Sequence, residues 1–306
     1  MIKQILKLGF TDTIEPVKDF FAEVLSETYD VIRDDTNPDY LIFGDRNFGE
    51  HNKTFNSKNV IKIFYTGENQ RPWDYDCHFA ITFDHIDIDR HYRLPLYVIY
   101  NWDNKRKGLD HVDVITKKHF DLKHWNRDFC SFVVKNGGCE KRNSFFHKLS
   151  VYKQVTAAGP LFNNAGFILE GGANAVQAKL AYLPKFKFTL CFENSSYPGY
   201  ATEKLYEALL GQTIPIYWGS PTIEADFNPK AFLNWHDYLD DDAFLDAIKR
   251  VDESQYLYQD MFCAPMFRDK HPFRSSLDDH QGSNKYFDMN RFRNWFSKNV
   301  YKGQLS

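Results

Sequence analysis

The chain has 306 residues, of which 43% are hydrophobic and 26% are charged, a balance typical of soluble globular proteins and not of disordered ones. With 38 basic and 41 acidic residues and no basic stripe, the sequence argues against a nucleic-acid partner. No run approaches the ~20 apolar residues of a membrane-spanning helix, and residues 1–15 lack a signal-peptide pattern. Together with five cysteines and no CxxC pair, this predicts a reducing, cytoplasmic location, with peripheral association at the inner membrane as the alternative.

Short apolar runs near the N-terminus predict one helix and several strands. The helix is expected at Val17–Thr28, where Pro16 opens it and the apolar side chains follow helical spacing. The strands are expected at Gln4–Phe10, Tyr29–Arg33, Tyr40–Gly44, Val60–Thr66 and Phe79–Phe83. This order predicts an open α/β sheet with mixed connections, followed by an irregular or helical insertion at residues 101–125.

A second α/β unit begins near Phe129–Val134, which reads as a buried strand. It continues with a helix at residues 140–153 and a loop over Gly159–Gly172. A strand, a helix and a second strand are then expected at Phe188–Phe192, Thr202–Leu210 and Ile214–Trp218, an alternation typical of parallel strands joined by a right-handed crossover. Further helices are predicted at Asp237–Arg250 and at Asp288–Val300, the latter with Phe292, Trp295 and Phe296 facing inward.

The predicted helix Thr202–Leu210 carries two charged side chains in its first turn. Its apolar positions pack on the sheet and leave Glu203 and Lys204 at the helix start, near the carboxyl edge of the strands where ligands of α/β proteins bind. Lys204 adds a full positive charge to the helix N-terminus and favours a phosphate or diphosphate. Glu203 either complements the helix dipole or accepts hydrogen bonds from the hydroxyls of a sugar or ribose.

Two further acidic residues follow predicted strands. Glu193 closes a buried strand, where a carboxylate is costly unless it is paired, and a structural network with a lysine or backbone N–H groups explains it most simply. Asn194 and Ser195, which follow, either hold the loop or touch a ligand. Glu68, in Thr66-Gly67-Glu68-Asn69, is expected to be a general base if it faces Lys204 across an interdomain cleft, although loop glutamates are mostly solvated.

Other chemistries have little support in the sequence. Asp74-Tyr75-Asp76 and Asp87-Ile88-Asp89 are Asp-x-Asp pairs of the kind that hold a metal on a nucleotide-sugar, but such pairs are common by chance and we expect no metal site. The 11 histidines show no HExxH spacing. The sequence also contains no GxSxG, GxxxxGK[ST] or GxGxxG, which excludes the usual serine hydrolase, P-loop and dinucleotide patterns.

Taken together, these segments resemble the α-1,3/α-1,4-fucosyltransferases of glycosyltransferase family 10, particularly the bacterial members. The resemblance rests on the stretch from Phe188 through Tyr200-Ala201-Thr202-Glu203-Lys204 to Pro221, continued by Phe227-Asn228-Pro229-Lys230. Phe64–Asn69 resembles the family's N-terminal motif with the proposed base, and the similarity covers roughly residues 30–240. The motif is long and ordered, and therefore more specific than a short pattern.

The resemblance implies a GT-B fold with two Rossmann-like domains facing across a cleft. The implied domains are an acceptor-binding domain at residues 1–128, a GDP-sugar-binding domain at residues 129–285, and a C-terminal helix at residues 286–306 that returns to the first domain. It implies an inverting fucosyltransferase that moves L-fucose from GDP-fucose to an N-acetylglucosamine- or N-acetyllactosamine-type oligosaccharide. No cofactor is implied as required, and a divalent metal is at most stimulatory.

The same resemblance assigns roles to residues. Glu68 is the expected base, Glu203 contacts hydroxyls of the donor, and Lys204 neutralises the diphosphate. Asn194, Ser195 and Tyr200 are expected along the donor.

One feature departs from the bacterial pattern, in which a Gly-rich loop before the main motif carries a diphosphate-binding arginine. The corresponding residues 158–164 contain none, so Lys185 and Lys187 are the proposed substitutes, with Lys179 as a further candidate. Two alternatives stay open: a transferase of the same family that uses another GDP-sugar, and a non-catalytic glycan- or nucleotide-binding protein on the same fold. The combination of Glu68 with Lys204 argues against the second alternative.

Overall fold

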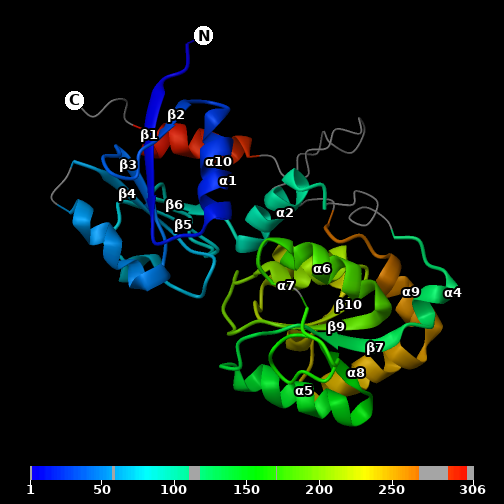
Figure 1. Ribbon diagram of the computed structural model, residues 1–306. Coiled ribbons are helices and arrows are strands. Elements are labelled where there is room, and N and C mark those ends of the chain that lie inside the picture. Colours follow the sequence, from blue (N-terminus) through cyan, green and yellow to red (C-terminus); the bar gives the residue numbers. More distant parts are fainter. Residues whose placement is uncertain (1, 57–58, 110–117, 170, 269–288, 302–306) are drawn as a thin grey trace. The chain divides into compact units, whose positions relative to one another are not determined.

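The computed structural model describes residues 2–56, 59–109, 118–169, 171–268 and 289–301 (Figure 1). The chain divides into two compact units, residues 1–106 with 273–306, and residues 107–272. The division falls at residue 106, earlier than the expected residue 128. The reason is that Trp102 packs on Phe20 of the first unit, at 5.4 Å between ring centroids, whereas Trp125 packs on Tyr258 of the second, at 5.7 Å.

The first unit contains a six-stranded parallel sheet with the strand order β2-β1-β3-β4-β5-β6. Its strands are β1 Ile5–Thr11, β2 Asp30–Arg33, β3 Tyr40–Phe43, β4 Ile61–Tyr65, β5 Phe79–Thr82 and β6 His91–Arg93. Its helices are α1 Glu15–Ser26, α2 Leu96–Arg106, α10 Asn290–Trp295 and the π-helical turn Phe296–Val300, with 3₁₀ segments at Arg46–Phe55 and Pro72–Asp74. The β1, β3 and β4 strands are central and largely buried, so the core lies along them.

Helix α1 covers one face of this sheet because its apolar residues follow helical spacing. Val17, Phe20, Phe21, Val24 and Leu25 are all buried, and Pro16 lies in the first turn, where its missing N–H costs nothing. Helix α10 lies beside α1 (Figure 1), with Phe292 packed on Phe21 at 5.7 Å between ring centroids. The C-terminal residues therefore complete the core that the N-terminal helix begins.

The second unit contains a five-stranded parallel sheet with the order β11-β10-β9-β7-β8. Its strands are β7 Asp128–Phe132, β8 Val155–Ala157, β9 Phe186–Phe192, β10 Ile214–Trp218 and β11 Leu233–Asn234. Its helices are α4 Leu122–Trp125, α5 Glu140–Tyr152, α6 Ala175–Tyr182, α7 Glu203–Leu210, α8 Asp241–Glu253 and α9 Gln255–Cys263. Short 3₁₀ segments lie at Gly172–Asn174, Leu183–Lys185, Ile223–Ala225, Pro229–Ala231 and Trp235–Asp237.

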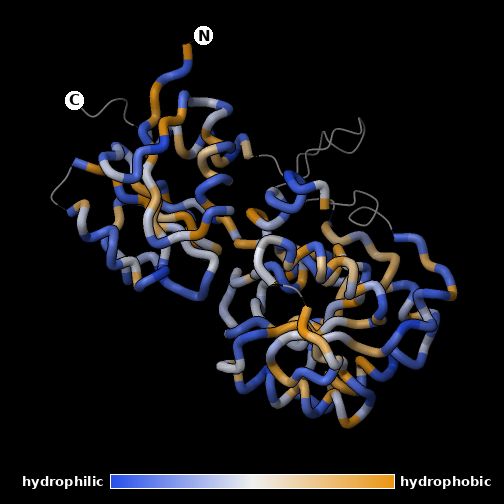
Figure 2. Tube along the Cα trace, in the orientation of Figure 1, coloured by the Kyte–Doolittle hydropathy of each residue, from blue (hydrophilic) through white to orange (hydrophobic). Residues whose placement is uncertain are grey.

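The core of this unit lies between the sheet and helices α5, α8 and α9. Phe145 of α5 stacks on Phe192 of β9, at 4.9 Å between ring centroids, and Phe244 of α8 packs on Phe145 at 5.3 Å. Figure 2 shows hydrophobic segments gathered inside each unit and hydrophilic segments along its outer loops. No helix in the described ranges is both long and apolar enough to cross a bilayer.

The expected α/β class is confirmed, while two details of the sheets differ from expectation. All strand pairs of the described residues are parallel, so the mixed connections predicted for the first sheet are wrong. Strands β6, β8 and β11 were not expected, because two or three residues are too few to show a period-2 pattern.

Candidate active site

The β9–α7 connection in the second unit gathers charged side chains at the carboxyl edge of the sheet. All seven residues of β9 are buried, and helix α7 begins at Glu203 after the loop that follows the strand. Thr202 is the N-cap residue of α7, but its hydroxyl does not cap the helix. The reason lies in a neighbouring carboxylate.

Glu193 is fully buried, and its carboxylate lies within hydrogen-bonding distance of three donors, one of which, the Thr202 hydroxyl, is close to both oxygens. Its Oε1 accepts from the backbone N–H of Thr202 at 2.8 Å and from the Thr202 hydroxyl at 2.9 Å. Its Oε2 accepts from the same hydroxyl at 2.7 Å and from the Lys204 ammonium at 2.9 Å. Glu193 is thus the centre of a structural network, as its position predicted, and it holds the Lys204 side chain at the start of the helix.

Burial and charge act in opposite directions on the carboxylates here. Burial raises the pKa of Glu193, because its loss of hydration outweighs the attraction of Lys204. Burial also raises the pKa of Glu203, but the charges of Lys204 and Lys179 outweigh that effect and leave it lowered. Glu203 is therefore an ionised acceptor within 3.6 Å of the Lys204 ammonium.

The turn after β10 closes tightly over this cluster. A Cβ on Gly219 would lie 2.5 Å from Cγ of Glu193 and 2.5 Å from the Tyr217 hydroxyl oxygen, so only glycine fits. The Ser220 N–H donates to the Tyr217 hydroxyl at 2.8 Å, and the Ser220 hydroxyl accepts from the Gly199 N–H at 2.8 Å. The two loops that flank Lys204 are therefore bonded to each other.

Arg142 of helix α5 reaches the same edge of the sheet and was not predicted from the sequence. It is fully buried, and its Nη1 donates to Oδ1 of Asn194 at 2.7 Å. Its Nη2 donates to the carbonyl of Asn136, while its Nε has no hydrogen-bond partner. Arg142 thereby joins the loops after β7 and β9 and places a guanidinium beside Asn194.

The other loop residues expected to line the donor differ in their exposure to solvent. Asn194 is exposed and Ser195 is half-buried, so both offer polar surface at this edge. Tyr200, by contrast, is only 1% exposed, so its side chain packs within the folded loop. Its expected place along the donor stays a prediction.

The proposed substitutes for the missing arginine do not lie at this edge. Lys187 is the second residue of β9, and its ammonium pairs with Asp252 at 2.6 Å, whereas Glu193 follows the last residue of the same strand. A strand rises ~3.3 Å per residue, which separates the two positions by roughly 20 Å. Lys185 precedes β9 at the same far end, with its ammonium 5.5 Å from the centre of the Tyr182 ring.

Lys179 is the one of these lysines that lies near the cluster. Its ammonium pairs with Glu207 of α7 at 2.6 Å, and its charge helps to keep Glu203 ionised. Lys179 therefore affects the candidate site by keeping Glu203 ionised, while its own ammonium is paired with Glu207.

The first unit carries the other predicted residue. Glu68 is exposed, three residues beyond the end of β4, and its N–H donates to the Thr66 hydroxyl at 2.9 Å. A Cβ on Gly67 would lie 2.7 Å from the Leu96 side chain, so this turn also depends on glycine. The loop is fixed, and the Glu68 carboxylate lies at its surface.

A buried ion pair supports this loop. Arg71 donates to Asp84 and to the side-chain oxygen of Asn69, and its guanidinium lies 4.7 Å from the centre of the Phe83 ring. Asp84 in turn accepts from the Thr82 hydroxyl at 2.6 Å. The loops that follow β4 and β5 are therefore tied together by this ion pair.

The Asp-x-Asp pairs serve different purposes. Asp76 pairs with the buried Lys62 at 2.6 Å, whereas Asp87 and Asp89 line a surface pocket. Among the residues that the structure describes, no three histidine, cysteine or acidic side chains are grouped so that they could hold a metal ion.

Comparisons with known proteins give matches over both units. Residues 5–100 match the family model for the alpha-(1,3)-fucosyltransferase FucT N-terminal domain. Residues 122–278 match the model for the C-terminal part of glycosyltransferase family 10 (fucosyltransferase). The first match lies within the first unit, and the second match covers most of the second unit.

Several curated proteins are similar to this chain. An alpha-(1,3)-fucosyltransferase of Helicobacter pylori is 33% identical over 283 residues, which cover 81% of this chain and 57% of that protein. Alpha-(1,3)-fucosyltransferase B of Drosophila melanogaster is 25% identical, covering 59% and 41%, and GDP-fucose protein O-fucosyltransferase 3 of Bos taurus is 28% identical, covering 46% and 30%. The chain thus spans little more than half of the length of the first of these relatives and less than half of the other two.

Solved structures of an alpha1,3-fucosyltransferase match the fold. One has a TM-score of 0.74 at 29% identity and covers 87% of this chain and 83% of that one. Another, described as a complex with GDP-fucose, has a TM-score of 0.72 at 29% identity and covers 88% and 84%. The two parallel α/β units therefore have the GT-B type of fold that the sequence predicted.

Proposed function

The chain belongs to glycosyltransferase family 10, and on that premise we propose that it is an inverting fucosyltransferase with GDP-fucose as its donor. The proposed acceptor is a hydroxyl of an N-acetylglucosamine- or N-acetyllactosamine-type glycan, with an α-1,3 or α-1,4 linkage as the product. The observation that carries the proposal is the buried Glu193–Thr202–Lys204 cluster, which fixes an ammonium at the N-terminus of α7. A fixed cation at a helix N-terminus suits the diphosphate of a nucleotide-sugar.

The donor half of the reaction uses residues of the second unit. Lys204 neutralises the charge that builds up on the diphosphate as GDP leaves, and Glu203 accepts hydrogen bonds from hydroxyls of the donor. Asn194 and Ser195 line the donor, and Arg142 supplies the second positive charge from behind Asn194. This role is electrostatic and acts at a distance, because Arg142 is fully buried and reaches the edge of the sheet only through its 2.7 Å bond to Asn194.

The acceptor half uses Glu68. As the acceptor oxygen forms its bond to C1 of fucose, the bond from C1 to the diphosphate oxygen breaks, GDP leaves, and the acceptor proton passes to Glu68. Attack on the face opposite the leaving group converts the β-linked donor into an α-fucoside. The exposed carboxylate on a loop fixed by Thr66 and Arg71 supports this role.

Two alternatives from the sequence have less support. Another GDP-sugar as donor was suggested by the absent arginine, but Arg142 provides a guanidinium at that edge of the sheet. A non-catalytic binding protein has no use for a loop carboxylate braced by a buried ion pair. We further propose a cytoplasmic location, in keeping with five cysteines that include no CxxC pair.

The proposed reaction uses Lys204 and Arg142 where other glycosyltransferases use a metal ion. We therefore propose that the enzyme needs no divalent metal, and that Mg²⁺ or Mn²⁺ is at most stimulatory. Turnover measured in excess EDTA tests this, because complete loss and recovery on adding Mn²⁺ would contradict it.

The test of the function is a donor and acceptor screen with the full chain. Release of GDP or UDP from GDP-fucose, GDP-mannose and UDP-sugars is measured with and without N-acetyllactosamine, and the product linkage is read by NMR. We expect fucose transfer from GDP-fucose with an α-linked product. Release from another GDP-sugar alone would favour the first alternative, and binding of GDP without any turnover would favour the second.

A further inference from the structure

A surface pocket lies along β6, which is the last strand of the first sheet. Its volume is about 620 Å³, within the ~300–1,000 Å³ usual for ligand sites. The strand and the loop before it supply most of the lining, and helix α10 supplies one residue. The lining residues are Ile86, Asp87, Ile88, Asp89, His91, Tyr92, Arg93 and Trp295.

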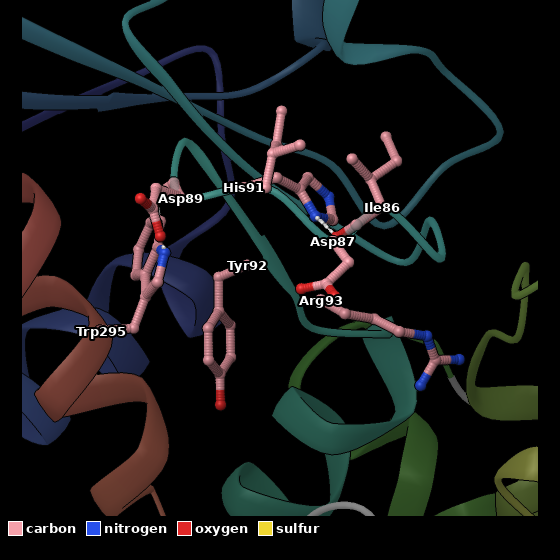
Figure 3. A pocket seen from close by; sticks show the side chains of 8 residues that line it. Ile86, Asp87, Asp89, His91, Tyr92, Arg93 and Trp295 are labelled. Atoms are coloured by element: carbon pink, nitrogen blue, oxygen red, sulfur yellow. Dashed lines mark hydrogen bonds between the residues drawn. The ribbon is translucent and has the colours of Figure 1, made fainter.

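One wall of the pocket is formed by two aromatic rings. Tyr92 and Trp295 project side by side, with 5.3 Å between their centroids and 44° between their planes (Figure 3). Trp295 donates from its indole N–H to the carbonyl of Asp89 at 3.0 Å and packs edge-on against Phe79. Trp295 was expected to face inward, but it is only half-buried, whereas Phe292 and Phe296 beside it are fully buried.

The rest of the lining is polar and held in place. The His91 ring is buried, with its nitrogens within hydrogen-bonding distance of the Ile86 carbonyl (3.0 Å) and the Thr82 hydroxyl (2.9 Å). The Arg93 Nε donates to the carbonyl of Phe83 at 3.1 Å. The loop that carries Asp87 and Asp89 is therefore anchored at both ends, while the two carboxylates are exposed.

The charges of the side chains that line the pocket determine which kind of ligand it can bind. Burial lowers the pKa of His91, so its ring is neutral near pH 7. Asp87 and Asp89 then outnumber Arg93, and an anionic ligand such as a nucleotide is disfavoured. Aromatic faces beside carboxylates suit a neutral ligand with one CH-rich face and several hydroxyl groups, which describes a sugar ring.

The register of the sheet places this pocket near Glu68. Tyr65, Ile81 and Tyr92 are aligned across β4, β5 and β6, so Arg93 lies at the same carboxyl edge as the loop that carries Glu68. Two strand spacings amount to about 10 Å. A chain of sugars that starts at Trp295 and follows β6 therefore leads toward the carboxylate.

We propose that this pocket binds a neutral sugar unit of the acceptor glycan, at least two units away from the sugar that receives fucose. The proposal rests on the proposed function, because it names the part of the acceptor that the pocket holds. In this arrangement the sugar ring stacks on Trp295 and Tyr92, and its hydroxyls donate to Asp87 and Asp89.

The test compares a short acceptor with a longer one. KM and kcat are measured for N-acetyllactosamine and for its tetrasaccharide dimer with wild type, Trp295→Ala and Asp87→Asn. We expect Trp295→Ala to raise KM for the tetrasaccharide roughly two- to tenfold, the worth of one aromatic contact, and to leave kcat and KM for GDP-fucose unchanged. The disaccharide, which is too short to reach the pocket, should show no change.

Two other variants are measured beside Trp295→Ala. Asp87→Asn changes an exposed loop carboxylate without removing packing, so it tests the pocket if Trp295→Ala fails to fold. Tyr256→Ala, which removes a 78% exposed ring on α9, is the matched control and should leave every constant unchanged.

Saturation-transfer NMR of the tetrasaccharide without donor reads binding apart from turnover. Binding that is lost in Trp295→Ala supports the pocket even if no fucose is transferred. Fucose transfer with equal tetrasaccharide KM in wild type and both pocket variants overturns the pocket and leaves the proposed function standing. The two carboxylates of the pocket could instead attract a cationic peptide. Binding of a lysine-rich peptide in place of the tetrasaccharide therefore also overturns the proposal of a sugar site.

Discussion

Lys204 and Lys187 are both paired lysines of the second unit, and their positions predict opposite effects. Lys204→Ala removes the ammonium at the start of α7 and leaves Glu193 without its ion-pair partner. The loss of a charge-assisted contact costs roughly 1.5–3 kcal/mol, so we expect GDP to bind about ten- to a hundredfold more weakly in calorimetric titration. Lys187→Met, at the far end of β9, is the control and should leave the affinity for GDP unchanged. If the two variants behave alike, Lys204 does not bind the diphosphate.

Substitution of Glu68 should affect turnover without affecting the binding of GDP. Glu68→Gln keeps the size of the side chain on its fixed loop but removes the base, so turnover should fall by about 10²- to 10⁴-fold. The affinity for GDP, measured by titration, should stay the same. Glu50→Gln, an exposed glutamate of the same unit paired with Lys53, should change neither quantity. Unchanged turnover in Glu68→Gln would falsify the base assignment.

Most of the residues that the sequence proposed for the candidate site lie beyond the ends of strands, whereas a side chain brought in from another helix was not predicted. Glu193, Lys204 and Glu68 follow strands, and the end of a parallel strand is where α/β proteins place ligands. Arg142 lies more than fifty residues before Asn194 on another helix, and only the pairing of β7 with β9 brings them together. The sequence contained one indication of this role for Arg142. Its long cationic side chain lies in the first turn of a helix that follows a predicted strand and an Asn-Gly-Gly loop.

At the scale of elements, the turn after β10 determines the geometry of the candidate site. Gly219→Ala places a methyl group 2.5 Å from Glu193 and from Tyr217, so either the turn or the carboxylate must move. We expect a loss of roughly 1–3 kcal/mol in the free energy of unfolding together with weaker GDP binding. Gly171→Ala, where an added Cβ meets no atom within 4 Å, should be neutral in thermal unfolding and in GDP titration. A stable Gly219→Ala variant with full affinity for GDP would contradict the close packing of this turn.

The elements that the sequence predicted well are those with a long hydrophobic pattern. Helix α1 and strands β1, β9 and β10 appear within two residues of their predicted ends. Strand β6 was missed because only three residues form it, and with it the pocket that depends on the late residue Trp295. The parallel pairing of the first sheet was also missed, since local sequence does not show in which direction neighbouring strands run.

At the scale of the whole molecule, the two units should respond separately to ligand. The residues proposed to bind the donor all lie in the second unit, so GDP at 100 times its Kd should stabilise that unit by about 2.7 kcal/mol. In calorimetry we expect GDP to raise the transition of the second unit and to leave that of the first in place. A uniform shift of the whole profile would mean that the units unfold together.

The variant Phe292→Ala assigns the transitions in the same experiment. Phe292 is fully buried against Phe21 and Tyr92 in the first unit, so its truncation should cost about 3–5 kcal/mol there. The GDP-sensitive transition should keep its temperature, because that unit is unaltered. Loss of the GDP-sensitive transition instead would contradict the assignment of the donor residues to a separate unit.

The two units are not equivalent along the chain, and this has a consequence during synthesis. The second unit is one continuous segment, whereas the first is built from residues 1–106 and 273–306. On the ribosome, the second unit can therefore fold as soon as its last strand and helices emerge. The first sheet must wait for Phe292 and Phe296, and until then Phe21, Tyr29 and Tyr40 lack the rings that cover them. The part of the first unit that is translated first is thus completed only after the second unit has been made.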